Sequence, residues 1–316
     1  MTSFLAQRFL SMLLTALIVS ILVVLLVHAV PGNIVQQMLG QLGAGSSDAR
    51  ATLEAYFGLN RPMHMQYLDW LGELMRGSLG DSWNQGTPVV NLVLRAFAVS
   101  AELAVLSLLF ALLVGSLLGI AAALFHDTVV DLGIQAFNVL GLSLPAFWVG
   151  AMMLVVASNV FGWGPPFRYA GPLDNLQLNA QIMVLPMLAL GLFNAAAISQ
   201  FVRDLVLEAV RLDFVRTATA KGASRTTVYA KHTFRNILVP LTSFTGVIFI
   251  GILGGVVAIE AVFNLPGIGR LILWALQTRD YPVVQGGVFL MAAVTLLVTL
   301  AVDFLYAVFD PRITYA

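Results

Sequence analysis

The sequence predicts an all-α, polytopic membrane protein with six transmembrane helices. Hydrophobic residues make up 59% of the chain and charged residues only 10%, whereas soluble domains average about 45–50% and about 25%. The mean hydropathy of +0.91 agrees with this composition. A helix needs about 20 apolar residues to cross a bilayer, and apolar segments of that length recur along the chain. These observations indicate a protein whose core lies in lipid.

Six segments meet the length requirement and carry at most one charged side chain each. They are 9–27, 103–125, 132–161, 182–202, 237–259 and 286–309. Pro145 lies inside the third segment, where a proline predicts a kink. An even number of spans places both chain termini on the same side of the membrane.

The distribution of charge predicts which side that is. The stretch 203–236 lies between two apolar segments and holds seven of the sixteen lysines and arginines. Because basic loops stay in the cytoplasm, we expect this loop and both termini to be cytoplasmic. A signal peptide is the alternative for the first segment, but its 19 residues exceed the usual apolar run of about 7–15.

Composition also excludes several kinds of function. The net charge is zero, so the chain has no overall attraction for nucleic acid. Since it contains no cysteine, disulfides and thiolate metal sites are excluded.

The spans divide the chain into three parts. Residues 1–31 form the cytoplasmic N-terminus and first transmembrane helix, 32–95 an extracytoplasmic segment, and 96–316 a five-helix core that includes the cytoplasmic loop 203–236. Within the second part, the apolar spacing of 63–75 predicts an amphipathic helix.

The cytoplasmic loop has the pattern of two helices joined by a tight turn. Asp213 is a suitable N-cap and Gly222 a suitable C-terminal stop, and Ser224 can cap a second helix. The first helix would have a small apolar face surrounded by arginine and lysine, which suits a groove on another protein. The alternative is a loop that only fixes topology or contacts anionic lipid.

The loop sequence FVRTATAKGAS resembles the EAA loop of ABC-importer permeases of the dipeptide/oligopeptide/nickel family. Ala218 and Gly222 match its most recognisable positions, while Arg216 stands where the general motif has glutamate. Other segments resemble the same family in the same order: VHAVPG, RGSLGDSW, EAVFNLPGIGRLILWAL, RDYPVVQG and DFLYAVFDPRI. The resemblance therefore covers nearly the whole chain.

This resemblance implies a type I ABC importer permease fold and one half of a heterodimeric pore in the bacterial cytoplasmic (inner) membrane. It implies four partners besides the lipid bilayer: a second homologous permease, two cytoplasmic ABC ATPases and an extracytoplasmic solute-binding protein. ATP and magnesium would bind to the ATPases, and this chain would bind no cofactor. The coupling helix that docks on an ATPase would comprise Asp213, Phe214, Val215, Arg216, Thr217, Ala218, Lys221, Gly222 and Ala223.

The resemblance leaves the solute open. Peptides are the first expectation, and nickel complexes, glutathione, opines or oligosaccharides are alternatives within the family.

The sequence favours a non-catalytic subunit. The lysine of a P-loop follows glycine, but the only lysines, Lys221 and Lys231, both follow alanine. The sequence also lacks the GxSxG and HExxH motifs of hydrolases. A self-sufficient secondary transporter or channel is the alternative from another class. Such a transporter usually shows inverted repeats and polar groups at the midplane, whereas the six spans show no evident duplication and almost no charge.

Three acidic residues in or beside the spans are candidates for the pore or its gate: Glu102, Glu260 and Asp303. Charged side chains within a membrane are costly and are often functional. We expect structural pairing or gate-lining for all three, and direct contact with the solute is the alternative. The tripeptide Met63-His64-Met65 offers soft ligands, but we expect contact with lipid or a partner rather than a metal ion.

Two pairs of glycines have the spacing that allows helices to approach closely. They are Gly115 with Gly119 and Gly251 with Gly255, and each allows close helix packing, either within the bundle of this chain or at the interface with a second permease.

Overall fold

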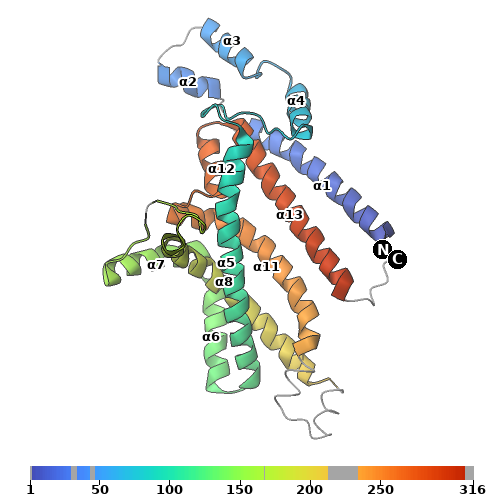
Figure 1. Cartoon of the computed structure of the whole chain (residues 1–316), viewed down its shortest axis with the longest axis vertical. Helices are drawn as coiled ribbons and strands as arrows, with labels where there is room; N and C mark the ends of the chain where they lie inside the picture. The colour runs from blue at the N-terminus through green and yellow to red at the C-terminus, as the bar shows by residue number, and fades with distance from the viewer. Residues whose placement is uncertain (1, 30–33, 43–46, 167, 213–233, 310–316) are drawn as a thin grey trace. The chain divides into compact units, whose positions relative to one another are not determined.

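The computed structural model describes residues 2–29, 34–42, 47–166, 168–212 and 234–309, and their regular secondary structure is α-helical (Figure 1). The predicted all-α class is therefore confirmed. The helices are α1 (Thr2–Ala29), α2 (Ile34–Leu42), α3 (Ser47–Tyr56), α4 (Met63–Met75), α5 (Val89–Leu124), α6 (Val129–Ser143), α7 (Ala146–Phe161), α8 (Leu176–Val210), α11 (Phe234–Phe263), α12 (Ile268–Gln277) and α13 (Tyr281–Phe309).

Five of these helices are long and apolar enough to cross a membrane: α1, α5, α8, α11 and α13. The predicted third span is divided into α6 and α7, which meet at an angle of 103° and would together supply a sixth crossing. The expected kink at Pro145 is therefore a sharp break. Leu144 is extended, with ψ at 130°, because a proline disfavours helical backbone in the residue before it.

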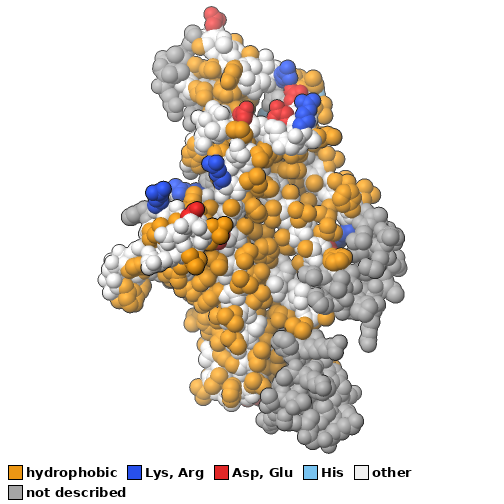
Figure 2. Space-filling model, in the orientation of Figure 1, with side chains coloured by type: hydrophobic (Ala, Val, Ile, Leu, Met, Phe, Trp, Pro, Cys, Tyr) orange, Lys and Arg blue, Asp and Glu red, His pale blue; other side chains and the backbone are white. Residues whose placement is uncertain are grey.

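The exposed side chains of α5 fit a lipid environment. Leu109, Leu113 and Leu117 are spaced one helical turn apart and are each 58–64% exposed. Hydrophobic side chains cover most of the surface over α5 and α6 in Figure 2. Such a stripe would be unfavourable in water and is favourable against acyl chains.

The chain forms two compact units. The first comprises Met1–Val99 and Pro266–Leu297. Its core includes Val27 from α1, Val89 and Val93 from α5, Ile268 from α12 and Val283 from α13. The amphipathic helix predicted over 63–75 is confirmed, since α4 has those bounds.

A buried carboxylate holds two distant segments of the first unit together. Asp280 is fully buried and accepts hydrogen bonds from the Ser82 hydroxyl at 2.5 Å, the Trp83 amide at 3.1 Å and the Asn84 amide at 3.2 Å. A buried charge is tolerated when donors surround it in this way. The contact joins the RGSLGDSW and RDYPVVQG segments, which lie almost 200 residues apart in sequence.

The second unit comprises Ser100–Leu265 and Val298–Ala316. In this unit α6, α7 and α11 all pack on α8. The buried face of α8 is rich in small side chains, including Ala189, Gly191, Ala195 and Ala196. Small side chains let several helices approach one axis closely, so α8 is the central helix of this unit.

The first predicted glycine pair forms a tight contact between α5 and α8. A Cβ on Gly115 would lie 2.7 Å from the Ala195 carbonyl oxygen, and one on Gly119 would lie 2.5 Å from the Ser199 carbonyl oxygen. Neither position has room for a side chain. The prediction for this pair is therefore confirmed.

The second glycine pair forms a close contact within this chain at only one of its two positions. A Cβ on Gly255 would lie 3.3 Å from Leu190 Cδ1, but one on Gly251 would meet no described atom within 4 Å. Gly251 lies one turn before Gly255 on α11 and is exposed, so no described helix of this chain packs against it. A contact of Gly251 with a second permease stays a prediction.

Candidate functional site

The predicted coupling-helix residues, Asp213 to Ala223, lie outside the described residues. The structure does describe the helices on either side of them, α8 and α11. Helix α8 continues to Val210, eight residues beyond the predicted end of the span at residue 202. The first part of the predicted loop is therefore a continuation of the central helix of the second unit.

Arg203, in this continuation, is the centre of a polar cluster that we call the Arg203 cluster: Arg203, Asp131, Gln135 and His126. Its Nε donates to Asp131 Oδ1 and its Nη2 to Asp131 Oδ2, both at 2.8 Å. With its amide oxygen turned toward the guanidinium, Gln135 accepts from Nε at 2.8 Å and Nη1 at 3.2 Å. The two parallel charge-assisted hydrogen bonds between Arg203 and Asp131 strengthen this ion pair and fix its geometry.

The pair is well shielded from solvent. The side chain of Asp131 is 7% exposed and that of Arg203 is 14% exposed. Water competes weakly for such groups, so this pair differs from the surface ion pairs that contribute little to stability.

The turn between α5 and α6 brings Asp131 into position. Asp127 adopts a left-handed backbone conformation, with φ at 61°, which aspartate tolerates better than most residues. Its amide donates to Asp131 Oδ2 at 3.2 Å. The turn thus holds the carboxylate in a position where Arg203 can bind it.

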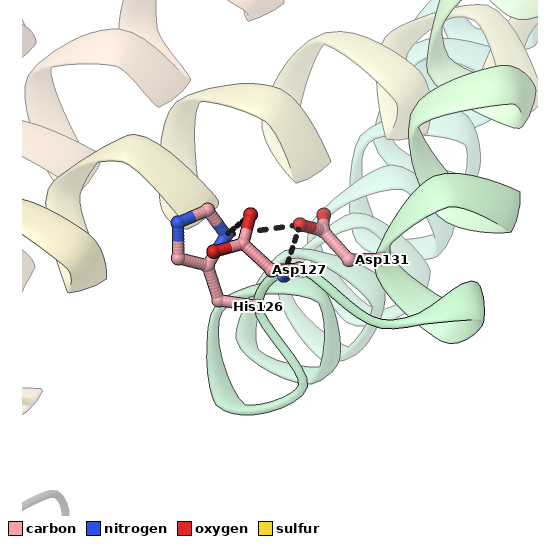
Figure 3. A group of neighbouring side chains, drawn as sticks. All are labelled: His126, Asp127 and Asp131. Carbon is pink, nitrogen blue, oxygen red and sulfur yellow. Dashed lines mark hydrogen bonds and ion pairs between the residues drawn. The ribbon is translucent and has the colours of Figure 1, made fainter.

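His126 lies beside Asp131 (Figure 3) and is also close to Arg203. Its Nδ1 is 3.0 Å from Asp131 Oδ2 and 3.1 Å from Arg203 Nη2. A single ring nitrogen either donates to the carboxylate or accepts from the guanidinium. His126 can therefore support the pair in either form, but through only one of the two contacts at a time.

Three side chains of this region could hold a metal ion by their spacing: the ligand atoms of His126, Asp127 and Asp131 lie within 4.8 Å of one another. The guanidinium of Arg203 already binds both oxygens of Asp131, so it supplies the positive charge that this carboxylate requires. A divalent cation there would be repelled by Arg203 and would have to displace it. The donor set fits an arginine better than a metal.

Apolar packing extends the attachment toward the end of α8. Val206 and Ala209 of α8 are buried in the same hydrophobic cluster as Ala123 of α5 and Ile237 of α11. The Arg203 cluster and this packing together fasten the end of α8 to the α5–α6 hairpin. A force applied beyond Val210 would be transmitted to both helices.

Two of the three predicted gate residues, Glu102 and Glu260, lie at the other end of α5 and α11. Glu260 is fully buried and accepts a hydrogen bond from the Ser100 hydroxyl. Glu102 Oε2 accepts from the Tyr169 hydroxyl at 2.6 Å, and its Oε1 is buried without a hydrogen-bond partner among the described residues. Asp303, the third, is half-buried in α13.

Tyr169 lies in the connection between α7 and α8. Burial raises the pKa of its hydroxyl above 10, and the neighbouring Glu102 carboxylate raises this pKa further. Tyr169 therefore remains protonated at neutral pH and acts as the donor to Glu102.

Asp131, Arg203 and Tyr169 were not predicted as site residues. From the sequence, Arg203 counted only as one charge of a basic loop. The sequence did hold a signal for Asp131 and Arg203. Both are charged residues next to predicted apolar spans, where charged side chains usually have partners.

Comparison with protein families decides the identity. Residues 115–315 match the family described as binding-protein-dependent transport system inner membrane component. Residues 1–104 match the N-terminal domain of the same membrane component. The chain belongs to this family. It is a permease subunit of an ABC importer and a multi-pass protein of the inner membrane.

Curated relatives cover the whole permease. A putative peptide transport system permease of Brucella suis biovar 1 (strain 1330) is 33% identical over 100% of both chains. A di/tripeptide transport system permease of Pseudomonas aeruginosa (strain UCBPP-PA14) is 34% identical over 100% of this chain and 99% of the relative. A glutathione transport system permease of Salmonella choleraesuis (strain SC-B67) is 34% identical over 100% of both.

The permease fold also resembles a solved structure. A chain of the inward-facing MetNI methionine ABC transporter superposes with a TM-score of 0.54 at 14% identity, covering 70% of this permease and 97% of that chain. The likeness is one of fold alone. Permeases of this family act together with ATPase and binding-protein partners and are in general not catalytic.

Proposed function

We propose that this permease forms one half of a heterodimeric pore that imports peptides or a related small solute delivered by an extracytoplasmic binding protein. Two cytoplasmic ATPases would drive the transport. The observation that carries the proposal is the attachment of α8: the central helix of the second unit runs into the predicted docking loop and is bound to the α5–α6 hairpin through Arg203 and Asp131. The names of the relatives support peptides as the first choice of solute.

In this proposal the segment from Asp213 to Ala223 docks in a cleft of one ATPase. Rigid-body motion of the ATPase would then move α8 and its bound hairpin together. ATP and magnesium would be held by the ATPases, and this chain would have no catalytic role.

The acidic residues would belong to the gate at the other end of the same helices. Glu260 with Ser100 and Glu102 with Tyr169 each join two elements of the second unit by a side-chain hydrogen bond. Such contacts can break and re-form as helices move. We include Asp303 in this role because an acid within a transmembrane helix is rarely placed there without a function.

We propose that both termini are cytoplasmic and that 32–95 lie outside the cytoplasm, with 96–316 as the transmembrane core. Reporter fusions at Ser46 and Asn175 are expected to be external, and one at Thr226 internal. The reverse pattern would contradict this orientation.

Liposome transport tests the proposed function. The purified chain alone is expected to accumulate no solute against a gradient. Reconstituted with its second permease, ATPases and binding protein, it is expected to import a labelled dipeptide in an ATP-dependent manner. Active accumulation by the chain alone would contradict the proposal. Competition by unlabelled glutathione, nickel complexes, opines or oligosaccharides would show which solute the system prefers.

A further inference from the structure

The first unit contains a cavity of about 350 Å³ that the coupling mechanism does not use. It lies among the end of α3, α4, the 79–83 loop and the start of α13. Its volume is within the range of about 300–1,000 Å³ that small-molecule sites occupy. The lining is about equally polar and apolar, so the cavity can both bury a ligand and orient it.

Aromatic rings form a continuous wall along one side of the cavity. Tyr56 contacts Phe57 with ring centroids 5.1 Å apart, Phe57 contacts Trp83 at 5.0 Å, and Trp83 contacts Tyr281 at 5.2 Å. All four line the cavity. The face of such a ring attracts a cation within about 6 Å.

The charged groups of the cavity are predominantly acidic. Arg61 is the only arginine in the lining, and it is paired with Asp69 at 2.7 Å. Glu73 and Asp81 also line the cavity, and within the described part of the chain no hydrogen bond or ion pair engages their carboxylates. With His28 counted as neutral, one positive and three negative side chains give the lining a net charge of −2.

Backbone geometry brings the Glu73 carboxylate close to the cavity wall. Gly80 has φ at +78°, and a Cβ at that position would lie 3.3 Å from Glu73 Oε2. The glycine therefore allows the carboxylate to approach the 79–83 loop, the loop that also carries Trp83. Glu73 itself is exposed, so its carboxylate lies beside this loop and stays accessible to a ligand.

His28 has a different role in the lining. Its Nδ1 lies 2.8 Å from the Val24 carbonyl oxygen, and its Nε2 lies 3.1 Å from Gln66 Oε1. Gln66 in turn donates to the Arg61 carbonyl oxygen. The ring is thus engaged by α1 and α4, and the Glu73 side of the cavity is left to a ligand.

A larger hollow of about 630 Å³ lies between α7 and α8 in the second unit, but its lining is almost wholly apolar, as at Met152, Val156 and Leu188. It offers little by which a polar solute could be recognised, and it carries no proposal.

We propose that the cavity of the first unit binds the free ammonium group of the transported solute, with Glu73 and Asp81 as counter-charges and the aromatic wall as the cation-binding face. The inference rests on the proposed function, because a peptide is the solute that would present such a group. Since the cavity is small, it would take the amino-terminal end of a peptide and leave the remainder outside.

Ligand-observed NMR on the purified full chain in lipid nanodiscs tests the site. Tetramethylammonium, with sodium chloride at equal ionic strength as the control, probes the cation face independently of transport. Ala-Ala is expected to bind at least about tenfold more tightly than N-acetyl-Ala-Ala, which lacks the ammonium charge.

Glu73→Gln is expected to weaken the binding of both tetramethylammonium and Ala-Ala by about tenfold. Phe57→Leu is also expected to weaken the binding of both ligands. Glu54→Gln is the matched control, because Glu54 pairs with Arg50 on α3 and is not part of the lining. Equal binding of the two dipeptides, or binding unaffected by Glu73→Gln, would overturn the proposal. Glu73-dependent binding of tetramethylammonium in a complex that imports no peptide would support the site and reject peptide as the solute.

Discussion

Replacing Arg203 with alanine is expected to uncouple the permease from its ATPases. The change leaves the Asp131 carboxylate, only 7% exposed, with the Asp127 amide and His126 as its remaining partners. Leaving one member of a buried ion pair unpaired costs about 3–5 kcal/mol. The end of α8 would then lose its polar attachment to the α5–α6 hairpin, so ATPase motion would reach the pore less completely.

Solute uptake and ATP hydrolysis, measured together in the reconstituted complex, check this prediction. Uptake should fall at least about tenfold while hydrolysis continues, so that more ATP is consumed per solute. The uptake of the Arg203→Lys variant should lie between that of the wild type and that of Arg203→Ala, because lysine keeps the charge but cannot form the bidentate contact. A parallel loss of hydrolysis and uptake would indicate a purely structural role.

Asp204→Asn is the matched control for this experiment. Asp204 lies 3.7 Å from Arg203 and is 63% exposed, so its removal should change uptake little. The exchange Asp131→Arg with Arg203→Asp should recover part of the coupling lost in either single variant. If Asp204→Asn were as damaging as Arg203→Ala, the buried pair would not be the important contact.

Gly119→Val is expected to destabilise the second unit. The new Cβ would lie 2.5 Å from the Ser199 carbonyl oxygen and 2.8 Å from Val202 Cβ, so α5 and α8 would have to separate. Overpacking of this kind costs about 1–3 kcal/mol. Here the obstacle is backbone, which cannot rotate away as a side chain can, so we expect the upper part of that range. Thermal unfolding in detergent measures the effect.

Gly133→Val controls for the intrinsic effect of valine in a helix. Gly133 is exposed within α6, and a Cβ there meets no described atom within 4 Å. Its midpoint of unfolding should stay close to that of the wild type. Equal melting temperatures for the two variants would show that the α5–α8 contact is looser than the structure indicates.

Much of the fold followed from local patterns in the sequence. Apolar segments long enough to span a bilayer predicted α1, α5, α8, α11 and α13, because the cost of placing a charge in lipid is a property of each segment by itself. The amphipathic spacing of 63–75 predicted α4, because such a pattern is also a property of one segment by itself. The break at Pro145 was predicted only as a kink, since a proline ends the helical hydrogen bonding but does not set the angle at which the next helix leaves.

The motif segments that resemble permeases identified the family, but they did not show what structural role each segment has. RGSLGDSW and RDYPVVQG were two separate similarities until the structure placed Ser82, Trp83 and Asn84 around the buried carboxylate of Asp280. Their shared role is a hydrogen-bonded anchor, which neither segment shows alone.

By itself, the sequence determined that this protein is a helical membrane protein with a basic loop between two of its spans, and its motifs pointed to an importer permease. The tertiary structure alone decided which polar residues act together: Arg203 with Asp131, Glu260 with Ser100, and Glu102 with Tyr169. Hydropathy reports how a residue interacts with lipid, and it is read one segment at a time. Pairing depends on the rotation and depth of each helix against its neighbours, and these are fixed only when small residues such as Gly119 let the helices meet.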